Sequence, residues 1–159
     1  MGGGGGGASN IRGLSDLVKK AKQELQKDDT PRRNVFISFA YEDIDDVNLL
    51  RAQSKNDNSP IEFNDWSVRE PFDSEKAGYI KGKIEDRINA CSVAVVYLSE
   101  NTAKSQWVDW EIQKSIELGK RVIGVYKGDQ RPTSLPKAIT ANKIKTVSWS
   151  KLADEIGHG

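Results

Sequence analysis

Residues 92–98 read Ser-Val-Ala-Val-Val-Tyr-Leu, and this stretch decides the fold class. A nearly continuous apolar run of this length predicts a strand that is buried on both of its faces. Strands of that kind occur in parallel sheets whose two faces are covered by helices. We therefore expect an α/β domain to be built around this strand.

Four more apolar runs predict strands, at residues 34–39, 61–64, 121–126 and, more weakly, 143–149. Helical patterns lie between them, at residues 45–55, 75–90 and 105–119. The connection 127–142 contains Pro132 and Pro136 and is expected to be mostly irregular. This alternation predicts a three-layer sandwich with a mainly parallel five-stranded sheet.

The ends of the predicted strands indicate where a ligand would bind. A doubly wound parallel sheet binds ligands beyond the carboxyl ends of its strands. The loops at that edge are expected at residues 40–43, 65–74 and 99–104. Site residues are therefore expected in these loops and in the helices that follow them.

Both ends of the chain differ from this pattern. Residues 1–10 include a run of glycines and are expected to be flexible. Residues 11–32 hold an amphipathic helix and a charged linker, and the helix either packs on the chain's own domain or binds partners or other copies. The predicted domain covers residues 33–150, and residues 151–159 form a C-terminal tail in which a short terminal helix is expected.

The composition argues against several kinds of partner. The formal net charge is +1, so no charge surplus points to nucleic acid or to a membrane surface. No apolar run approaches the ~20 residues needed to cross a bilayer, and the N-terminus lacks a secretory pattern. We expect a cytoplasmic protein.

Sites built on histidine or on several cysteines are excluded. Cys91 is the only cysteine, and the only histidine, His158, lies one residue from the C-terminus. A Ser-His-Asp triad, a Cys-His pair or a multi-histidine zinc site therefore cannot be built from this chain alone, and no metal is expected. No glycine-rich phosphate loop follows the first predicted strand, which argues against dinucleotide-binding and P-loop nucleotide folds.

The first predicted strand runs directly into acidic residues, in the phrase Phe36-Ile-Ser-Phe-Ala-Tyr-Glu-Asp43. Receiver domains also place acidic residues there, but they need an aspartate at the end of the third strand. The third strand here ends Tyr97-Leu-Ser-Glu-Asn101, so we discount a receiver domain. A flavodoxin-like nucleotide-binding regulator stays open as a weaker alternative.

The last of the three helical patterns contains the main candidate for chemistry. At the helical repeat, Val108, Ile112 and Ile116 form the stripe expected to face the sheet. Trp107 and Glu111 lie one turn apart on the flank of that stripe. The pair is either a carboxylate beside an indole at the ligand-binding edge or a solvated glutamate beside a packing tryptophan, and spacing alone favours the second interpretation.

A resemblance to a known family bears on this choice. Ser105, Trp107, Glu111 and Ile112 match the signature of enzymatic Toll/interleukin-receptor (TIR) domains: serine, one residue, tryptophan, then glutamate four positions later and an aliphatic residue. The phrase VFISFAYED resembles the opening box of that family. Other phrases are similar to the bacterial and archaeal TIR-like branch that includes the Thoeris anti-phage sensor proteins: VNLLRAQ, EFNDWSV, EPFDSE, YIKGKI, TAKSQWVDWEI and IGVY. The resemblance implies a flavodoxin-like TIR fold.

The resemblance also implies a site that cleaves NAD⁺, with Glu111 as its catalytic residue. In such domains the glutamate engages the ribose attached to nicotinamide. Cleavage expels neutral nicotinamide and leaves an oxocarbenium-like ribose, which a carboxylate can stabilise. NAD⁺ would be the substrate, and no cofactor is expected. Water as acceptor would give ADP-ribose, whereas an internal hydroxyl or an adenine nitrogen would give a cyclic isomer.

Further substrate contacts follow from the same resemblance. Phe39, Ala40 and Tyr41 would line the nicotinamide and ribose end of the site. An aromatic ring can stack on the cationic nicotinamide, which would suit Phe39 or Tyr41. Core packing for Phe39 and a surface position for Tyr41 are the alternatives.

The second and third of the expected loops supply the other candidates. Asp65 and Trp66 follow the second strand, where Asp65 either orients substrate or caps the next turn. Trp107 would lie beside the substrate next to Glu111. Because Ala40 stands where a larger polar or basic residue often occurs in the family, the phosphate contacts are unassigned, and Arg69 is a candidate for them.

Two functions are therefore expected, in order of preference. The first is a TIR-like NAD⁺ glycohydrolase or cyclase in prokaryotic antiviral defence, which acts on a downstream effector through a diffusible nucleotide product. The second is a non-catalytic TIR-like module that assembles through its faces and its N-terminal helix. Self-association through the TIR faces is expected in either case.

Overall fold

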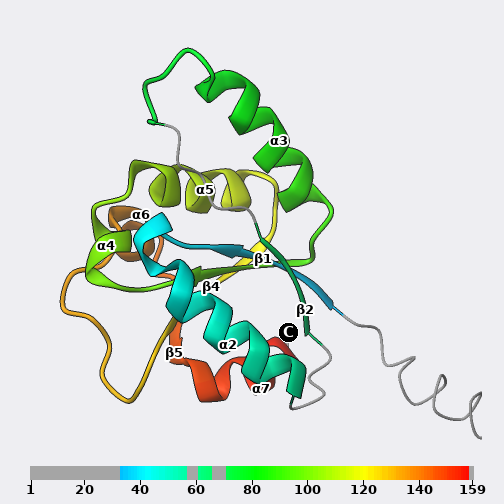
Figure 1. Ribbon diagram of the computed structural model, residues 1–159, viewed down its shortest axis with the longest axis vertical. Helices are drawn as coiled ribbons and strands as arrows, with labels where there is room; N and C mark the ends of the chain where they lie inside the picture. The colour runs from blue at the N-terminus through cyan, green and yellow to red at the C-terminus, as the bar shows by residue number, and fades with distance from the viewer. Residues whose placement is uncertain (1–32, 57–60, 66–70, 158–159) are drawn as a thin grey trace, which may run out of the picture. The chain divides into compact units, whose positions relative to one another are not determined.

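Five parallel strands form one sheet in the order β2-β1-β3-β4-β5 (Figure 1). The strands are β1 (Arg33–Ser38), β2 (Ile61–Asp65), β3 (Val93–Tyr97), β4 (Arg121–Tyr126) and β5 (Thr146–Ser148). This is the flavodoxin-like order of doubly wound domains. The predicted parallel α/β sheet is confirmed, and the apolar run at residues 92–98 supplies its central strand, β3.

The structure is a computed structural model that describes residues 33–56, 61–65 and 71–157, with residues 33, 54–56 and 61–65 described by their backbone alone. The glycine-rich start and the amphipathic helix expected in residues 1–32 lie outside this part of the chain, as do Trp66 and Arg69. Within it, no helix is both long enough and apolar enough to span a membrane.

Helices cover both faces of the sheet. They are α2 (Ile44–Asn56), α3 (Ala77–Asn89), α4 (Glu100–Ala103), α5 (Gln106–Glu117), α6 (Lys137–Ala141) and α7 (Leu152–Gly157), with short 3-10 turns η1 (Tyr41–Asp43) and η2 (Trp149–Lys151). Figure 1 shows α3 and α5 on one side of the sheet and α2 and α7 on the other. The three layers predicted from the sequence are therefore present.

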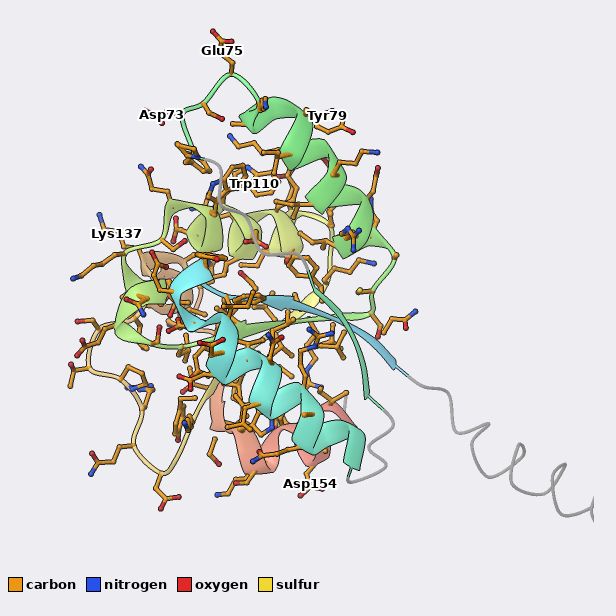
Figure 2. All side chains as sticks on the ribbon, in the orientation of Figure 1. Asp73, Glu75, Tyr79, Trp110, Lys137 and Asp154 are labelled. Carbon is orange, nitrogen blue, oxygen red and sulfur yellow. The ribbon has the colours of Figure 1, made fainter. Side chains whose placement is uncertain are left out.

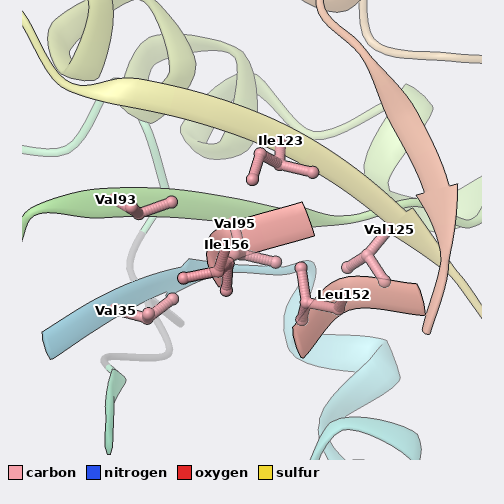
Figure 3. Packing of buried hydrophobic residues seen from close by; sticks show 7 residues of the cluster. All are labelled: Val35, Val93, Val95, Ile123, Val125, Leu152 and Ile156. Atoms are coloured by element: carbon pink, nitrogen blue, oxygen red, sulfur yellow. The ribbon is translucent and has the colours of Figure 1, made fainter. Parts of the chain in front are cut away.

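The face under α2 and α7 takes alternate residues of the central strands, because successive side chains of a strand point to opposite faces. One cluster on this face is drawn in Figure 3 and comprises Val35, Val93, Val95, Ile123, Val125, Leu152 and Ile156. Leu152 and Ile156 come from α7, in the segment that the sequence set apart as a tail at residues 151–159. The packed core therefore continues through Ile156.

The opposite face packs against α3, α5 and α6. Phe36 of β1 and Ala94 of β3 contact the α3 side, while Val96 lies in the cluster that contains Val108 and Ile112 of α5. Cys91 is buried in the first of these clusters, as expected for a small apolar residue before a strand. Residues of β1 with even numbers therefore face α3 and α5, which determines where the side chain of Ser38 points.

Helix α5 begins and ends as the sequence predicts. The Ser105 hydroxyl caps it by accepting a hydrogen bond from the Val108 N–H at 3.2 Å. Gly119 follows its last turn with φ of 74°, a conformation that glycine adopts without strain.

The face that α5 buries differs from the predicted stripe. Ile116, expected to face the sheet, is 37% exposed, whereas Ser115 and Glu111 are buried. The buried face is thus rotated toward Trp107 and Glu111. The reason is that α5 contacts α3 and β1 as well as the strands directly beneath it.

Candidate active site

The carboxyl ends of β1 and β3 meet at the point where the chain changes direction across the sheet. From β1 the chain passes to β2 on one side, and it then returns to β3 on the other side. Ligands of doubly wound folds bind at such a switch point. Two of the loops expected to form the site, residues 40–43 and 99–104, lie here and contain η1 and α4.

A buried carboxylate joins these two loops. Asp43 is 6% exposed and accepts hydrogen bonds from the Ser99 hydroxyl at 2.5 Å and from the Asn101 side-chain amide at 2.9 Å. Ser99 also caps α4, because its hydroxyl accepts from the backbone N–H groups of Asn101 and Thr102. Asp43 therefore holds η1 and α4 in a defined arrangement at the edge of the sheet.

The sequence predicts these loops, but it does not single out Asp43, Ser99 or Asn101 within them. One signal was available, since Ser99 and Thr102 have the spacing of a capping box directly after a strand. That signal places a helix start. It does not show that the same serine also donates to an aspartate from a distant part of the chain.

Glu111 lies inside the protein, although spacing alone favoured a solvated side chain. Its side chain is 2% exposed, and its Oε2 atom is buried without a hydrogen-bond partner. Ser38, at the carboxyl end of β1, is 2% exposed and its hydroxyl likewise has no partner. Two polar groups without partners are thus buried side by side, which is uncommon in folded proteins.

The environment of Glu111 opposes a negative charge. Burial raises the pKa of Glu111 well above its usual value of 4.5. The adjacent Ser38 hydroxyl acts in the opposite direction and lowers the pKa in part, although the two groups are not in hydrogen-bonding geometry. The carboxyl group is therefore held in its neutral form well above pH 4.5.

Charged groups on the surrounding elements are engaged elsewhere. Asp43 accepts hydrogen bonds from Ser99 and Asn101, and Lys81 lies over the rings of Phe72 and Trp110. Asp109 accepts from the Ala138 N–H and from the Gln113 amide. Lys114 pairs with Glu117. Burial and Ser38 are the causes of the Glu111 shift, and no charged group is among them. In the described part of the chain, Glu111 thus has no compensating cation.

Trp107 is buried in an aromatic cluster beneath α3. Its ring packs edge-to-face on Phe72 at 5.0 Å between centroids and on Trp110 at 6.1 Å. The Lys81 ammonium lies 4.2 Å from the centre of the Phe72 ring and covers the cluster from α3. Figure 2 shows Trp110 between α5 and α3. Trp107 therefore anchors the N-terminal half of α5, one turn from Glu111.

The other residues predicted to contact the substrate do not all lie on the same face of the sheet as Glu111. Phe39 is 4% exposed and packs with Val47 and Leu50 of α2, on the face opposite Glu111. Ala40 is buried and accepts a hydrogen bond from the Asp43 N–H at 2.9 Å through its carbonyl. Of the two roles considered for Phe39, the structure places it in core packing.

Two further candidates lie at the same edge of the sheet. Tyr41 is partly exposed at the start of η1. Asp65 ends β2 and is paired in register with Ile37 of β1, but its side chain lies outside the described part of the chain, as does all of Trp66. The structure thus places the backbone of Asp65, and no more, near the carboxyl end of β1.

A second polar group lies on the α2 face of this edge. The Tyr97 hydroxyl donates to Asp46 at 3.4 Å, and Asp46 pairs with Lys127 at 3.4 Å. Burial, followed by the charges of Asp46 and Asp43, raises the pKa of Tyr97 to about 12. Tyr97 is therefore a neutral hydrogen-bond donor at physiological pH and has no acid–base role there.

The family of this chain follows from its match to a family model. The model described as "Thoeris protein ThsB, TIR-like domain" matches residues 36–132, from β1 through the loop after β4. This chain belongs to that family. The match includes Glu111 and Ser38, and it confirms the resemblance seen in the sequence motifs.

One curated relative extends the comparison for this ThsB-type TIR-like chain. It is "Putative cyclic ADP-D-ribose synthase ThsB1" from Bacillus cereus (strain MSX-D12), which is 34% identical over 98 residues. The alignment covers 59% of this chain and 51% of the relative, so the chain spans about half the length of that protein.

A solved TIR domain supports the fold. The TIR domain of the Toll-related receptor TRR-2 from Hydra magnipapillata superposes with a TM-score of 0.51 at 22% identity, over 73% of this chain and 83% of that one. The TIR domains of the activated Roq1 resistosome give a TM-score of 0.45 at 23% identity, over 62% and 59% of the two chains. The first comparison shows a TIR-like fold, and the second is too distant to support an argument about assembly.

Proposed function

We propose that this chain cleaves the N-glycosidic bond of NAD⁺ and releases an ADP-ribose-type nucleotide as a signal in antiviral defence. The observation that carries the proposal is Glu111, a buried carboxyl group with a free oxygen beside the carboxyl end of β1. Membership of the ThsB TIR-like family and the name of the curated relative support the same reaction class.

The chemistry requires one bond to break and one to form. The bond between the nicotinamide nitrogen and ribose C1′ breaks, and its electron pair stays on the pyridine ring, which leaves as neutral nicotinamide. A water oxygen, an internal hydroxyl or an adenine ring nitrogen then bonds to C1′. The proton released comes from the water, from the hydroxyl or, for adenine, from its exocyclic amino group. The ribose passes through an oxocarbenium-like state that a carboxylate can stabilise and orient, so Glu111 is the proposed catalytic residue.

Burial of Glu111 links its ionisation to substrate binding. Desolvation raises the pKa of Glu111 and so favours its neutral form. The nicotinamide ring of NAD⁺ is cationic, and a cation placed beside the carboxyl group favours its ionised form. We therefore expect NAD⁺ binding to release a proton from Glu111. The carboxylate is then negatively charged when the oxocarbenium-like ribose forms.

The surroundings of Glu111 favour an internal acceptor over water. The neighbouring side chains on its helix, Trp107, Val108 and Ile112, are buried and apolar. Excluding water from such a site favours cyclisation over hydrolysis. Because only 2% of Glu111 is exposed, neighbouring side chains must move before the substrate reaches it. Tyr41, Ala40 and Asp65 are the proposed substrate contacts at this edge, whereas Phe39 is left out because it packs against α2.

The test compares two glutamates on the same helix. Concentrated protein is incubated with NAD⁺, with and without lysate from phage-infected cells, and nicotinamide release is followed by chromatography. We expect release by the parent and a loss of at least ~100-fold in Glu111→Gln, the size typical of removing a group that stabilises a transition state. Glu117→Gln makes the same chemical change at an exposed position and should keep the parent rate.

The result also separates the two functions expected from the sequence. If the parent releases no nicotinamide in any of these conditions, the enzyme proposal fails and the non-catalytic assembly module takes its place. Self-association and a downstream effector that binds the product stay predictions. Light scattering on the chain with and without residues 1–30 would test whether that segment drives assembly, and an unchanged mass would count against it.

A further inference from the structure

Ser38 presents a hydroxyl group that the folded chain leaves without a partner. It ends β1, it is 2% exposed, and its Oγ atom makes no hydrogen bond. A buried donor without an acceptor is unfavourable, and alanine would fill nearly the same volume without that penalty. A serine at this position therefore indicates a polar partner in some state of the protein.

The strand alternation identifies that partner. Ser38 points to the same face of the sheet as Phe36, which is the face covered by α3 and α5. On that face, the Glu111 carboxyl group of α5 carries a buried oxygen without a partner. The Ser38 hydroxyl lies close enough to this carboxyl group to influence its ionisation, which makes Glu111 the nearest candidate acceptor.

We propose that Ser38 is a positioning residue for Glu111: its hydroxyl donates to one oxygen of the ionised carboxylate and leaves the other oxygen for the substrate ribose. The contact to the carboxylate is independent of the reaction, while the role in ribose binding rests on the proposed function. Ser38 touches the glutamate and not the reacting atoms, so it acts through the orientation and ionisation of Glu111.

No other described group is available for this role. The elements around Glu111 carry the following other titratable or charged residues: Tyr41, Glu42 and Asp43 in η1, Tyr79, Lys81, Lys83, Glu85, Asp86 and Arg87 in α3, and Asp109, Lys114 and Glu117 in α5. None of these is among the causes of the Glu111 shift, which are burial and Ser38. A change in Glu111 ionisation after substitution of Ser38 can therefore be attributed to the serine.

The chain provides a matched control. Ser115 is also a buried serine, at 1% exposure, and it lies one turn after Glu111 on α5. Its hydroxyl donates to the backbone carbonyl of Glu111 at 2.7 Å and does not contact the carboxyl group. Ser115→Ala thus removes a hydroxyl group that is as deeply buried as that of Ser38. The contact that it removes is to the backbone carbonyl of Glu111 and not to its carboxyl group.

The experiment measures ionisation of Glu111 without requiring catalysis. Protein labelled with ¹³C at glutamate side-chain carboxyls is titrated by NMR, and the Glu111 signal is the one that disappears in Glu111→Gln. Ser38→Ala should move the Glu111 midpoint to higher pH, whereas Ser115→Ala should leave it unchanged. Ser38→Thr keeps the hydroxyl and should restore the parent midpoint. Thermal melts check that each variant is folded.

Kinetics then test the contribution to the reaction. In a plot of kcat against pH, Ser38→Ala should lower kcat by ~10-fold or more at the acidic end, because the carboxylate has lost one hydrogen bond. The difference in kcat between the variant and the parent should become smaller as pH rises. An unchanged Glu111 midpoint in Ser38→Ala, or an equal shift in Ser115→Ala, would overturn the positioning role. The parent could release no nicotinamide while Ser38→Ala still moves the Glu111 titration midpoint to higher pH. That result would support the contact between Ser38 and Glu111 and contradict only the proposed function.

Discussion

Glu111 shows at the scale of a single residue how context changes chemistry. Its spacing relative to Val108 and Ile112 allowed either a surface or a cleft position, and the periodicity alone favoured the surface. The structure buries it because α5 is contacted by α3 and β1 in addition to the strands beneath it. An isolated helix pattern carries no information on that second contact, so the solvated position favoured by spacing was wrong. The catalytic role that the family resemblance implies for Glu111 stays a prediction.

Burial of Glu111 should make stability depend on pH. The pKa of this carboxyl group is raised in the folded chain, whereas the unfolded chain has the usual value of 4.5. Above pH 4.5 the folded state therefore binds more protons than the unfolded state, and the free energy of unfolding falls as pH rises toward the folded pKa. The slope cannot exceed ~1.4 kcal/mol per pH unit for one group.

Glu111→Gln should remove this fall, because glutamine does not ionise. Urea unfolding between about pH 4 and pH 8 measures the effect. The variant should be more stable than the parent near neutral pH and close to it near pH 4. Glu117→Gln, at an exposed position, should keep the parent's slope. A variant and parent whose stabilities run parallel across this range would contradict the buried position of the carboxyl group.

At the scale of elements, local patterns predicted the middles of helices and strands well and some ends less well. The strand at 121–126 is found with both ends as predicted, while the one expected at 143–149 is limited to Thr146–Ser148. The four residues of α4 were not predicted, since a single turn has too few residues to show a period. These short pieces depend on contacts with other parts of the chain, such as the one from Asp43 to Ser99.

The cap of α5 gives a prediction at this scale. Ser105→Ala removes the acceptor for the Val108 N–H and should lower the free energy of unfolding by ~1 kcal/mol. Ser105→Asp keeps a capping oxygen and should stay near the parent. Chemical denaturation followed by far-UV circular dichroism measures both. Ser134→Ala, at an exposed serine in the loop after β4, should change stability by less than ~0.5 kcal/mol.

At the scale of the whole molecule, the last helix completes one face of the core. The sequence placed the domain boundary at residue 150 and predicted a short helix beyond it. Helix α7 packs Leu152 and Ile156 against side chains of strands β1, β3 and β4 on one face of the sheet, with both residues 2% exposed (Figure 3). An amphipathic pattern of six residues is too short to show whether the helix packs on the domain or stays exposed to solvent. The structure is therefore needed to assign α7 to the core.

Leu152→Ala should therefore cost ~2–5 kcal/mol of stability, the range for a large-to-small change in a packed core. Leu49→Ala, on α2 with the leucine 52% exposed, should cost less than ~0.5 kcal/mol. Thermal and urea unfolding of the two variants measure the difference. Equal losses would mean that α7 does not pack on the sheet in solution.

The fold class and the family signature can be predicted from the sequence alone, because apolar periodicity and motif spacing are local properties of the chain. Spacing favoured a surface position for Glu111, and the family resemblance made it the candidate residue. The burial of Glu111, the place of Ser38 beside it and the contact of Asp43 between the two loops follow only from the tertiary structure. Those features arise from strand order and from the side on which each helix packs, which bring distant segments together and remove water from between them.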